Sequence, residues 1–261
     1  MKDIVSILEN DSSDYIFNIL KIENHNSNSN SRLRFWFDHC KKNINDISGD
    51  IFEFGVFRGQ SIISMGILLK RLGSSKKIYG FDSFSGFPNY HENDSLDKFN
   101  ELRGDLFESE ISRRIELVTR LKKELSNIDS SPANISSSGE FNDTSYDAVK
   151  SKIELFGLDN IELIEGDFRE TVPAFFKEKQ KIIFSANIDC DLYDGYKICL
   201  PYISKYLQVG GYVHLDEYYS IKFPGARIAC EEFLSSNDTD LSLEKNDTPK
   251  EEFERWYLEK K

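Results

Sequence analysis

The chain has 261 residues, enough for one ordinary domain or for one domain that carries insertions. Hydrophobic residues make up 39% and charged residues 30%, which excludes global disorder because this apolar share can fill a core. The net charge of −12 repels phosphate backbones. Composition therefore disfavours nucleic-acid binding and favours a partner such as a divalent cation.

The four cysteines are Cys40, Cys190, Cys199 and Cys230. They match no zinc pattern, because the sequence has no C-x-x-C and no histidine pair near them. The first residues carry acids and lack the long apolar segment of a signal peptide. No stretch approaches the ~20 apolar residues that cross a bilayer. We therefore expect reduced thiols in a cytoplasmic protein with no membrane partner.

Residues 1–48 are expected to form an N-terminal segment before the main domain, residues 49–261. The stretch 21–32 is rich in Asn and Ser, so we expect it to be peripheral and to bury little surface. Residues 32–44 resume apolar spacing and predict a helix whose aromatic side chains pack into the core.

A βαβ unit opens the main domain. Residues 50–56 predict a short buried strand that ends at Gly55, and residues 58–73 predict a helix that follows at once. Residues 76–84 predict a second strand. Strand, tight glycine turn, helix and strand indicate a right-handed parallel crossover.

The next segment, residues 89–138, is long and mostly polar. It contains one predicted amphipathic helix near 108–126 and a loose Ser/Asn/Pro stretch at 126–139. An insertion of this length in a compact domain is typically a lid, a partner arm or a disordered loop, and we expect a lid or an arm.

Strands and helices alternate again after the insertion. We predict helices at 144–157, 170–180, 195–211 and 225–236, and strands at 161–168, 181–193 and 212–220. Four or five strands that alternate with helices predict an α/β fold with a doubly wound sheet.

In such sheets ligands bind at the carboxyl ends of the strands, and polar residues gather at these ends here. The glycine turn after the first strand permits close approach of a ligand, although it lacks the G-x-G-x-x-G of dinucleotide sites. An acid at the end of the second strand, Asp82, could accept both hydroxyls of a ribose. After the third strand, Asp167 could face an adenine edge or a ribose, and Phe168 could stack on a ring.

The most specific pattern is a pair of acidic strand ends. Asp189 and Asp191 close one strand, and Asp216 and Glu217 close another. Carboxylates that converge at one place repel each other, and a hard divalent cation such as Mg²⁺ resolves the repulsion. The alternative is a set of solvated loop acids and helix caps, and Asp194 is expected to cap the helix at 195–207.

Together these residues resemble the macrocin O-methyltransferase (TylF-like) family. The matching segments are GDIFEFGVFRGQSI (49–62), YGFDSFSGFP (79–88), GEFNDTSYDAVKSKIELFGLDNIELIEGDFRETVPAF (139–175), NIDCDLYDGYKICLPYISKYLQVGGYVHLDEY (187–218) and GARIACEEF (225–233). The resemblance covers roughly residues 49–235, except the interior of the insertion.

The resemblance implies a class I S-adenosylmethionine-dependent methyltransferase with a mostly parallel seven-stranded sheet and a helical and loop lid. It implies Mg²⁺ as a second cofactor, a hydroxyl of a sugar or sugar-containing natural product or glycan as acceptor, and a homodimer as a common assembly. Asp189, Asp216 and Glu217 would bind the metal, and Asp191 would be the general base. The cofactor-binding residues would be Glu53, Gly55, Arg58, Ser61, Asp82, Ser83, Asp167, Phe168 and Asp189.

The sequence departs from the family at two site positions. The family commonly has Asp-Asp where this chain has Asp216-Glu217, and a small residue where it has Cys190. Two alternatives stay open at this point. One is an S-adenosylmethionine-binding protein without transferase activity, and the other is a catechol-type O-methyltransferase.

Overall fold

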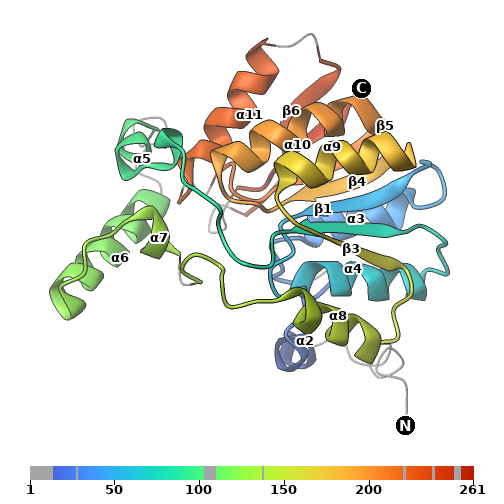
Figure 1. Ribbon diagram of the computed structural model, residues 1–261, viewed down its shortest axis with the longest axis horizontal. Coiled ribbons are helices and arrows are strands. Elements are labelled where there is room, and N and C mark those ends of the chain that lie inside the picture. Colours follow the sequence, from blue (N-terminus) through green and yellow to red (C-terminus); the bar gives the residue numbers. More distant parts are fainter. Residues whose placement is uncertain are drawn as a thin grey trace.

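A seven-stranded sheet in the order β3-β2-β1-β4-β5-β7-β6 forms the centre of the computed structural model (Figure 1). Strands β1 to β5 are parallel, and β7 is antiparallel to both of its neighbours. The α/β doubly wound sheet predicted from the sequence is thus confirmed. The strands are β1 (Asp50–Phe54), β2 (Ile78–Asp82), β3 (Ile161–Glu165), β4 (Ile183–Ile188), β5 (Leu207–Leu215), β6 (Leu241–Lys245) and β7 (Trp256–Lys260).

The structure describes residues 14–27, 29–102, 110–136, 138–219, 222–236, 239–249 and 254–261. Residues 1–13 of the predicted N-terminal segment lie outside these ranges, as do residues 103–109, where the helix predicted near 108–126 begins. Among the helices described, none is long and apolar enough to cross a membrane.

Helices cover both faces of the sheet (Figure 1). One face carries α3 (Arg34–Asn43), α4 (Gln60–Arg71) and α8 (Tyr146–Leu155), and the other carries α9 (Phe168–Lys179), α10 (Tyr193–Tyr206) and α11 (Pro224–Ser236). Strands β1, β2 and β4 are therefore buried on both sides, which explains their nearly continuous apolar sequences.

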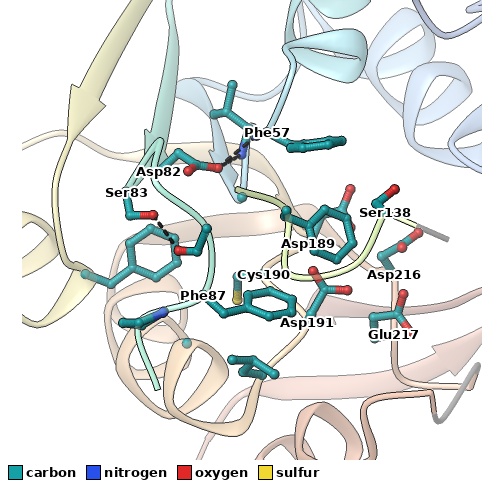
Figure 2. A pocket seen from close by; sticks show the side chains of 18 of the residues that line it. Phe57, Asp82, Ser83, Phe87, Ser138, Asp189, Cys190, Asp191, Asp216 and Glu217 are labelled. Atoms are coloured by element: carbon teal, nitrogen blue, oxygen red, sulfur yellow. Dashed lines mark hydrogen bonds between the residues drawn. The ribbon is translucent and has the colours of Figure 1, made fainter. Parts of the chain in front are cut away.

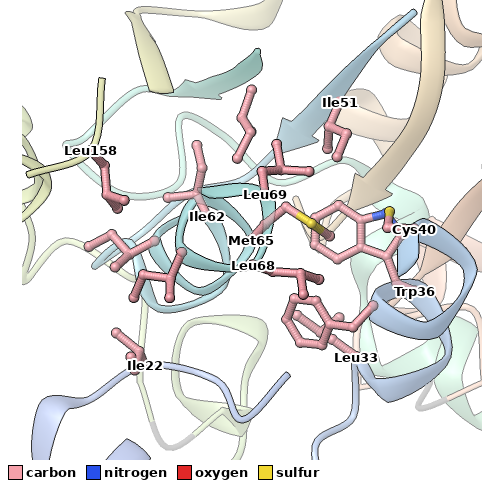
Figure 3. Close-up of a cluster of buried hydrophobic side chains, with 14 of the residues drawn as sticks. Ile22, Leu33, Trp36, Cys40, Ile51, Ile62, Met65, Leu68, Leu69 and Leu158 are labelled. Atoms are coloured by element: carbon pink, nitrogen blue, oxygen red, sulfur yellow. The ribbon is translucent and has the colours of Figure 1, made fainter. Parts of the chain in front are cut away.

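The core beneath α3 and α4 contains the aromatic residues that the sequence placed there (Figure 3). Trp36 and Met65 are fully buried and lie against the first strand. The indole N–H of Trp36 donates to Ser185 Oγ at 2.9 Å, so its one polar atom is satisfied. The predicted packing role of the α3 aromatics is confirmed for Trp36 and Phe37.

The prediction that residues 21–32 bury little surface is wrong. Ile22, Asn24, His25, Ser29 and Ser31 are buried. The polar side chains satisfy one another and the backbone: Ser29 Oγ donates to Asn24 O at 2.9 Å, and Leu33 N donates to Ser31 Oγ at 3.1 Å. A polar segment can therefore pack on the sheet domain with most of its buried polar groups paired, although the Asn26 side-chain amide nitrogen is buried without a partner among the residues that the structure describes.

His25 makes this segment sensitive to pH. Its Nε2 accepts a hydrogen bond from Arg71 at 2.9 Å, and its Nδ1 lies 3.2 Å from Ser64 Oγ, an arrangement that suits neutral imidazole. Burial, with Arg71 adding to it, lowers the pKa of His25 from 6.5 to about 3. Below pH 6.5 the unfolded chain therefore binds a proton that the folded chain does not, and stability falls as the pH decreases toward 3.

We expect the thermal midpoint to fall between pH 7 and pH 5, and to fall less in His25→Gln, which cannot titrate. Thermal unfolding followed by circular dichroism at several pH values measures this difference. His91→Gln is the control, because His91 stacks on Tyr193 away from this segment. An equal pH slope in wild type and His25→Gln would contradict the assignment.

The polar insertion forms a chain of short elements: η1 (Glu92–Asp94), α5 (Leu96–Leu102), α6 (Glu110–Ser126) and α7 (Pro132–Ile135). The helices α5, α6 and α7 extend away from the sheet in Figure 1. The sequence predicted α6 and missed the other three. We call η1 to α7 the lid.

Two buried side chains fasten the lid to the sheet domain. Asp94 is 1% exposed, and its carboxylate accepts from Tyr193 N and His91 N, both at 2.9 Å. It therefore serves the first turn of α10, where we expected Asp194 as the cap; that prediction is wrong because Leu192 is the N-cap residue. At the other end of the lid, Ile135 packs with Leu192 and Phe223.

The carboxyl end of α10 also differs from its prediction. The helix ends at Tyr206, and Gly210 and Gly211 lie inside β5 instead of stopping the helix. The antiparallel pair β6 and β7, which completes the sheet, was not recognised from the residue pattern. Both strands place buried leucines, Leu241 and Leu258, on the α10 and α11 side.

Candidate active site

A cavity of about 550 Å³ lies at the carboxyl ends of the parallel strands. Its volume falls within the usual range for small-molecule sites, roughly 300–1,000 Å³. Every predicted site residue except Glu53 lines it. Ser136, Ser138 and Phe141, from the segment that follows the lid, also line it, so the cavity lies between the sheet edge and the return of the insertion.

The glycine turn forms one wall of the cavity. Gly55 has φ +96°, and a Cβ there would overlap the backbone carbonyl of Asp189, so the ends of β1 and β4 can approach each other because this residue is glycine. Phe57, also in the left-handed region, follows in the turn. Thr144 Oγ1 donates to Phe57 O at 2.5 Å and ties the turn to the segment after the lid.

Asp82 holds this turn in place (Figure 2). One carboxylate oxygen accepts from the backbone N–H groups of Val56 at 2.7 Å and Phe57 at 2.8 Å, and the other accepts from Phe84 N at 2.6 Å. The side chain therefore lines the cavity and also organises two loops. Carboxylate oxygens carry two lone pairs each, so Asp82 keeps acceptor capacity for a ligand hydroxyl.

Glu53 lies behind the cavity wall. It is fully buried, and it accepts a hydrogen bond from Ser61 Oγ through Oε1, while its Oε2 has no partner among the described residues. Burial raises the pKa of Glu53 to about 8, although the Ser61 bond favours the charged form. The structure places Ser61 on the cavity wall and Glu53 as its support.

The remaining predicted cofactor residues have partners of their own. Arg58 pairs with Asp143, and Ser83 Oγ donates to Gly86 O at 2.7 Å within its own turn. Asp167 is the N-cap of α9, accepting from Arg169 N at 2.8 Å, and its carboxylate also binds the Arg169 guanidinium. Phe168 begins α9 and lines the cavity with its ring edge-on to that of Phe54.

The acidic strand ends meet at the other wall, as predicted (Figure 2). Asp189 follows β4, and Asp216 follows β5. A guanidinium joins them: Arg32 Nη2 lies 2.7 Å from Asp189 Oδ2, and Nη1 contacts Asp216 Oδ1. No local pattern pointed to Arg32, because it lies in the polar stretch expected to be peripheral, 157 residues before Asp189.

Asp191 occupies a tight turn beside this cluster. Its φ is +59°, and Leu192 N donates to Cys190 O at 2.6 Å across it. Left-handed backbone costs energy for most residues and is tolerated best by Gly, Asn and Asp, so the position is specialised. The side chain is buried, and burial, with the charges of Glu217 and Asp189 adding to it, raises the pKa of Asp191 well above the usual range.

Two further groups complete the electrostatics of the cluster. Lys222 Nζ lies 3.2 Å from Glu217 Oε1 and lines the cavity; it follows the β5 acids closely in the sequence, but it was not singled out. His214 is fully buried, with Nε2 3.6 Å from Asp216 Oδ1. Burial opposes ionisation of Asp216, but Arg32 and His214 together hold its pKa well below the usual range.

The residues of the two walls are chemically suited to the cofactor and the metal ion that the sequence resemblance implies. The glycine turn and Asp82 offer backbone and carboxylate partners for an adenosine-type ligand, and the acidic wall offers carboxylate oxygens of the kind that Mg²⁺ prefers. Within the described ranges, no three such side chains already stand in an arrangement that could hold an ion. These carboxylate oxygens are suitable ligands for a cation. In the structure, however, they form ion pairs with Arg32 and Lys222.

Comparison with solved structures places the fold. The O-methyltransferase NovP aligns with a TM-score of 0.62 at 20% identity, covering 99% of this chain and 95% of that chain. The calicheamicin methyltransferase CalS11 aligns with a TM-score of 0.57 at 24% identity, covering 85% and 76%. An O-methyltransferase from Bacillus cereus in complex with SAH aligns at 0.51 and 13% identity, covering 97% and 93%. The class I methyltransferase fold predicted from the sequence is thereby confirmed.

One curated relative is an 8-demethyl-8-(2,3-dimethoxy-alpha-L-rhamnosyl)-tetracenomycin-C 4'-O-methyltransferase from Streptomyces olivaceus, 26% identical over 175 residues. The match covers 66% of this chain and 54% of the relative, so the chain spans about half of that protein's length. The family model described as macrocin-O-methyltransferase (TylF) matches residues 30–118 and 125–251. These matched ranges include both walls of the cavity and most of the lid, and the chain belongs to the macrocin O-methyltransferase (TylF) family.

Proposed function

We propose that the protein is an S-adenosylmethionine-dependent and Mg²⁺-dependent O-methyltransferase that acts on a hydroxyl of a sugar, a sugar-containing natural product or a glycan. The observation that carries the proposal is one cavity whose two walls have different chemistry. The glycine turn with Asp82 forms one wall, and the cluster around Asp189, Asp191 and Asp216 forms the other. Family membership supports the same reaction.

The cofactor wall would hold S-adenosylmethionine, which when bound supplies an electrophilic methyl group. Gly55, Arg58 and Ser61 would line its methionine part, and Asp82 and Ser83 its ribose. Asp167 and Phe168 stand where an adenine ring could lie, with Phe168 able to stack on it. Asp189, at the junction of the two walls, would contact the cofactor as well as the cation.

On the acidic wall, Asp189, Asp216 and Glu217 would hold Mg²⁺, which when bound stabilises negative charge on an acceptor oxygen. Asp191 would take the proton from the acceptor hydroxyl. A sugar hydroxyl is a weak nucleophile because its pKa lies far above neutral, so a carboxylate in contact with it is needed. The raised pKa of Asp191 makes it a stronger base once it is ionised.

The acceptor side would lie toward the segment that follows the lid. Ser136, Ser138 and Phe141 line the cavity there and would contact the acceptor. The relative from Streptomyces olivaceus is named for methylation of a rhamnosyl compound, which supports a sugar as the acceptor class. The choice of hydroxyl would depend on this side of the cavity.

Metal removal tests the proposal. We expect methyl transfer to a panel of deoxysugar glycosides and nucleotide-linked sugars to fall to background in EDTA and to return when Mg²⁺ is added in excess. Product formation followed by mass spectrometry measures it. Activity that survives exhaustive chelation would remove the metal from the proposal.

The same panel decides between the alternatives. A catechol included in it would be the preferred acceptor of a catechol-type enzyme. Binding of S-adenosylmethionine in calorimetry, with no turnover of any acceptor at any metal concentration, would identify a binding protein. We expect neither result, because the Streptomyces olivaceus relative is named for a rhamnosyl compound and because Asp191 lies in the cavity beside the carboxylates proposed to hold the cation.

A further inference from the structure

We propose that Arg32 is a counter-ion for Asp189 and Asp216 when no divalent cation is bound. When a cation binds these two carboxylates, the Arg32 guanidinium moves to Glu23. The inference deepens the proposed function and rests on it, because it concerns access to the same acidic wall. Its evidence is the set of contacts that Arg32 makes with three carboxylates from different parts of the chain.

The first observation is the bridge itself. Arg32 Nη2 donates to Asp189 Oδ2 at 2.7 Å, and Nη1 pairs with Asp216 Oδ1. The two acidic side chains are 16% and 9% exposed, so water screens their mutual repulsion weakly. The guanidinium thus reaches both acids at once, with a charge-assisted hydrogen bond to Asp189 and an ion pair with Asp216.

The second observation is that this bridge uses the oxygen atoms that a cation would need. A divalent ion bound between Asp189 and Asp216 would stand within a few ångströms of the guanidinium. At this distance, in a partly buried site, the repulsion between like charges is strong. The cation and the Arg32 bridge therefore exclude each other.

A third carboxylate, that of Glu23, lies close to the Arg32 guanidinium. Arg32 Nε lies 3.7 Å from Glu23 Oε1, and Ser31 Oγ donates to Glu23 Oε2 at 2.7 Å, which orients that carboxylate. Glu23 is also fixed through its backbone, since Glu23 N donates to Gln60 O at 3.3 Å. Arg32 can thus leave the acidic wall and keep a charged partner.

The backbone around Arg32 confines the movement to the side chain. Leu33 is fully buried, and its N–H donates to Ser31 Oγ at 3.1 Å, while Arg34 N donates to Ser31 O at 3.2 Å. Rotation about the bonds of the Arg32 side chain would suffice to exchange one partner for the other. Without cation, Arg32 bridges the two acids; with cation, Glu23 takes up the guanidinium.

Direct measurement of Mn²⁺ binding tests the inference independently of activity. The full chain without S-adenosylmethionine is titrated with Mn²⁺, and free Mn²⁺ is followed by electron paramagnetic resonance. We expect Arg32→Gln to bind Mn²⁺ at least about tenfold more tightly than wild type, because the competing charge is gone. Arg169→Gln is the matched control: Arg169 lines the same cavity but pairs with Asp167, and we expect affinity within about twofold of wild type.

Glu23→Gln tests whether Arg32 exchanges its carboxylate partners or whether the charge of Glu23 simply attracts the cation. It removes the second acceptor, so we expect Mn²⁺ affinity to fall several-fold below wild type. In the Arg32→Gln background there is no guanidinium to receive, and the same change should then have less than about a twofold effect. A simple charge effect would instead weaken binding by the same factor in both backgrounds, and this outcome would overturn the inference.

An Arg32→Gln chain that binds Mn²⁺ no more tightly than wild type would also overturn it. If this variant does not fold, as judged by circular dichroism, Arg32→Lys takes its place, because one ammonium group cannot match the two-pronged bridge and should also raise affinity. The EDTA assay distinguishes the two failures. Activity lost in EDTA without a gain in affinity rejects the role of Arg32 alone, whereas activity that survives EDTA rejects the metal.

Discussion

Asp191→Asn is expected to lower the turnover number by roughly 10²–10⁴-fold, the range that general base catalysis contributes. The side chain keeps its size but can no longer accept the proton of the acceptor hydroxyl. Asparagine also tolerates the left-handed backbone at this position, where φ is +59°, so the turn should persist. Calorimetry should therefore show unchanged affinity for S-adenosylhomocysteine while product formation falls.

Asp194→Asn is the matched control for this experiment. Asp194 lies three residues further along, in the first turn of α10, and it lines the same cavity. We expect a much smaller effect on turnover there. Equal losses at both positions, or unchanged turnover in Asp191→Asn, would reject Asp191 as the base.

Asp82→Ala is expected to weaken cofactor binding by roughly 100-fold or more, about 2.8 kcal/mol at 1.4 kcal/mol per decade. The change leaves the N–H groups of Val56, Phe57 and Phe84 without their acceptor. Hydrogen bonds to charged groups contribute about 1.5–3 kcal/mol each, so the glycine turn would lose its shape as well as an acceptor for the ribose. Titration calorimetry with S-adenosylhomocysteine measures the loss.

Glu165→Gln provides the comparison for Asp82. Glu165 stands opposite Asp82 in the β2–β3 register, but its side chain is exposed. We expect its affinity for S-adenosylhomocysteine to match that of wild type. Intact affinity in Asp82→Ala would move the ribose site elsewhere and would leave Asp82 with a purely structural role.

Local patterns predicted the parallel half of the fold well. The strands β1, β2, β3 and β4 and the helix α4 are apolar segments bounded by glycine or acidic residues, and the alternation of strands with helices predicts that these strands run parallel. The same rule predicted that Asp189 and Asp216 meet, because the carboxyl ends of adjacent parallel strands lie at one edge of a sheet.

The remaining features depend on tertiary contacts that no local pattern encodes. Gly210 and Gly211 were predicted to stop α10, yet they lie inside β5, where the register shifts between the pairing of Leu207 with Ile183 and that of Tyr212 with Ser185. Asp94 caps α10 from a distance of 99 residues. The N-terminal stretch was predicted to be peripheral on composition, whereas its polar groups pair with one another and with α4, and this places Arg32 on the acidic wall.

The central claim is that the cofactor and a divalent cation share the cavity at the ends of β4 and β5. A crystal grown with S-adenosylhomocysteine and Mn²⁺, with anomalous scattering used to locate the metal, tests it most directly. We predict manganese at roughly 2.0–2.3 Å from oxygens of Asp189, Asp216 and Glu217, with the ligand's sulfur facing Asp191. Manganese bound away from these carboxylates, or S-adenosylhomocysteine bound outside this cavity, would contradict the account.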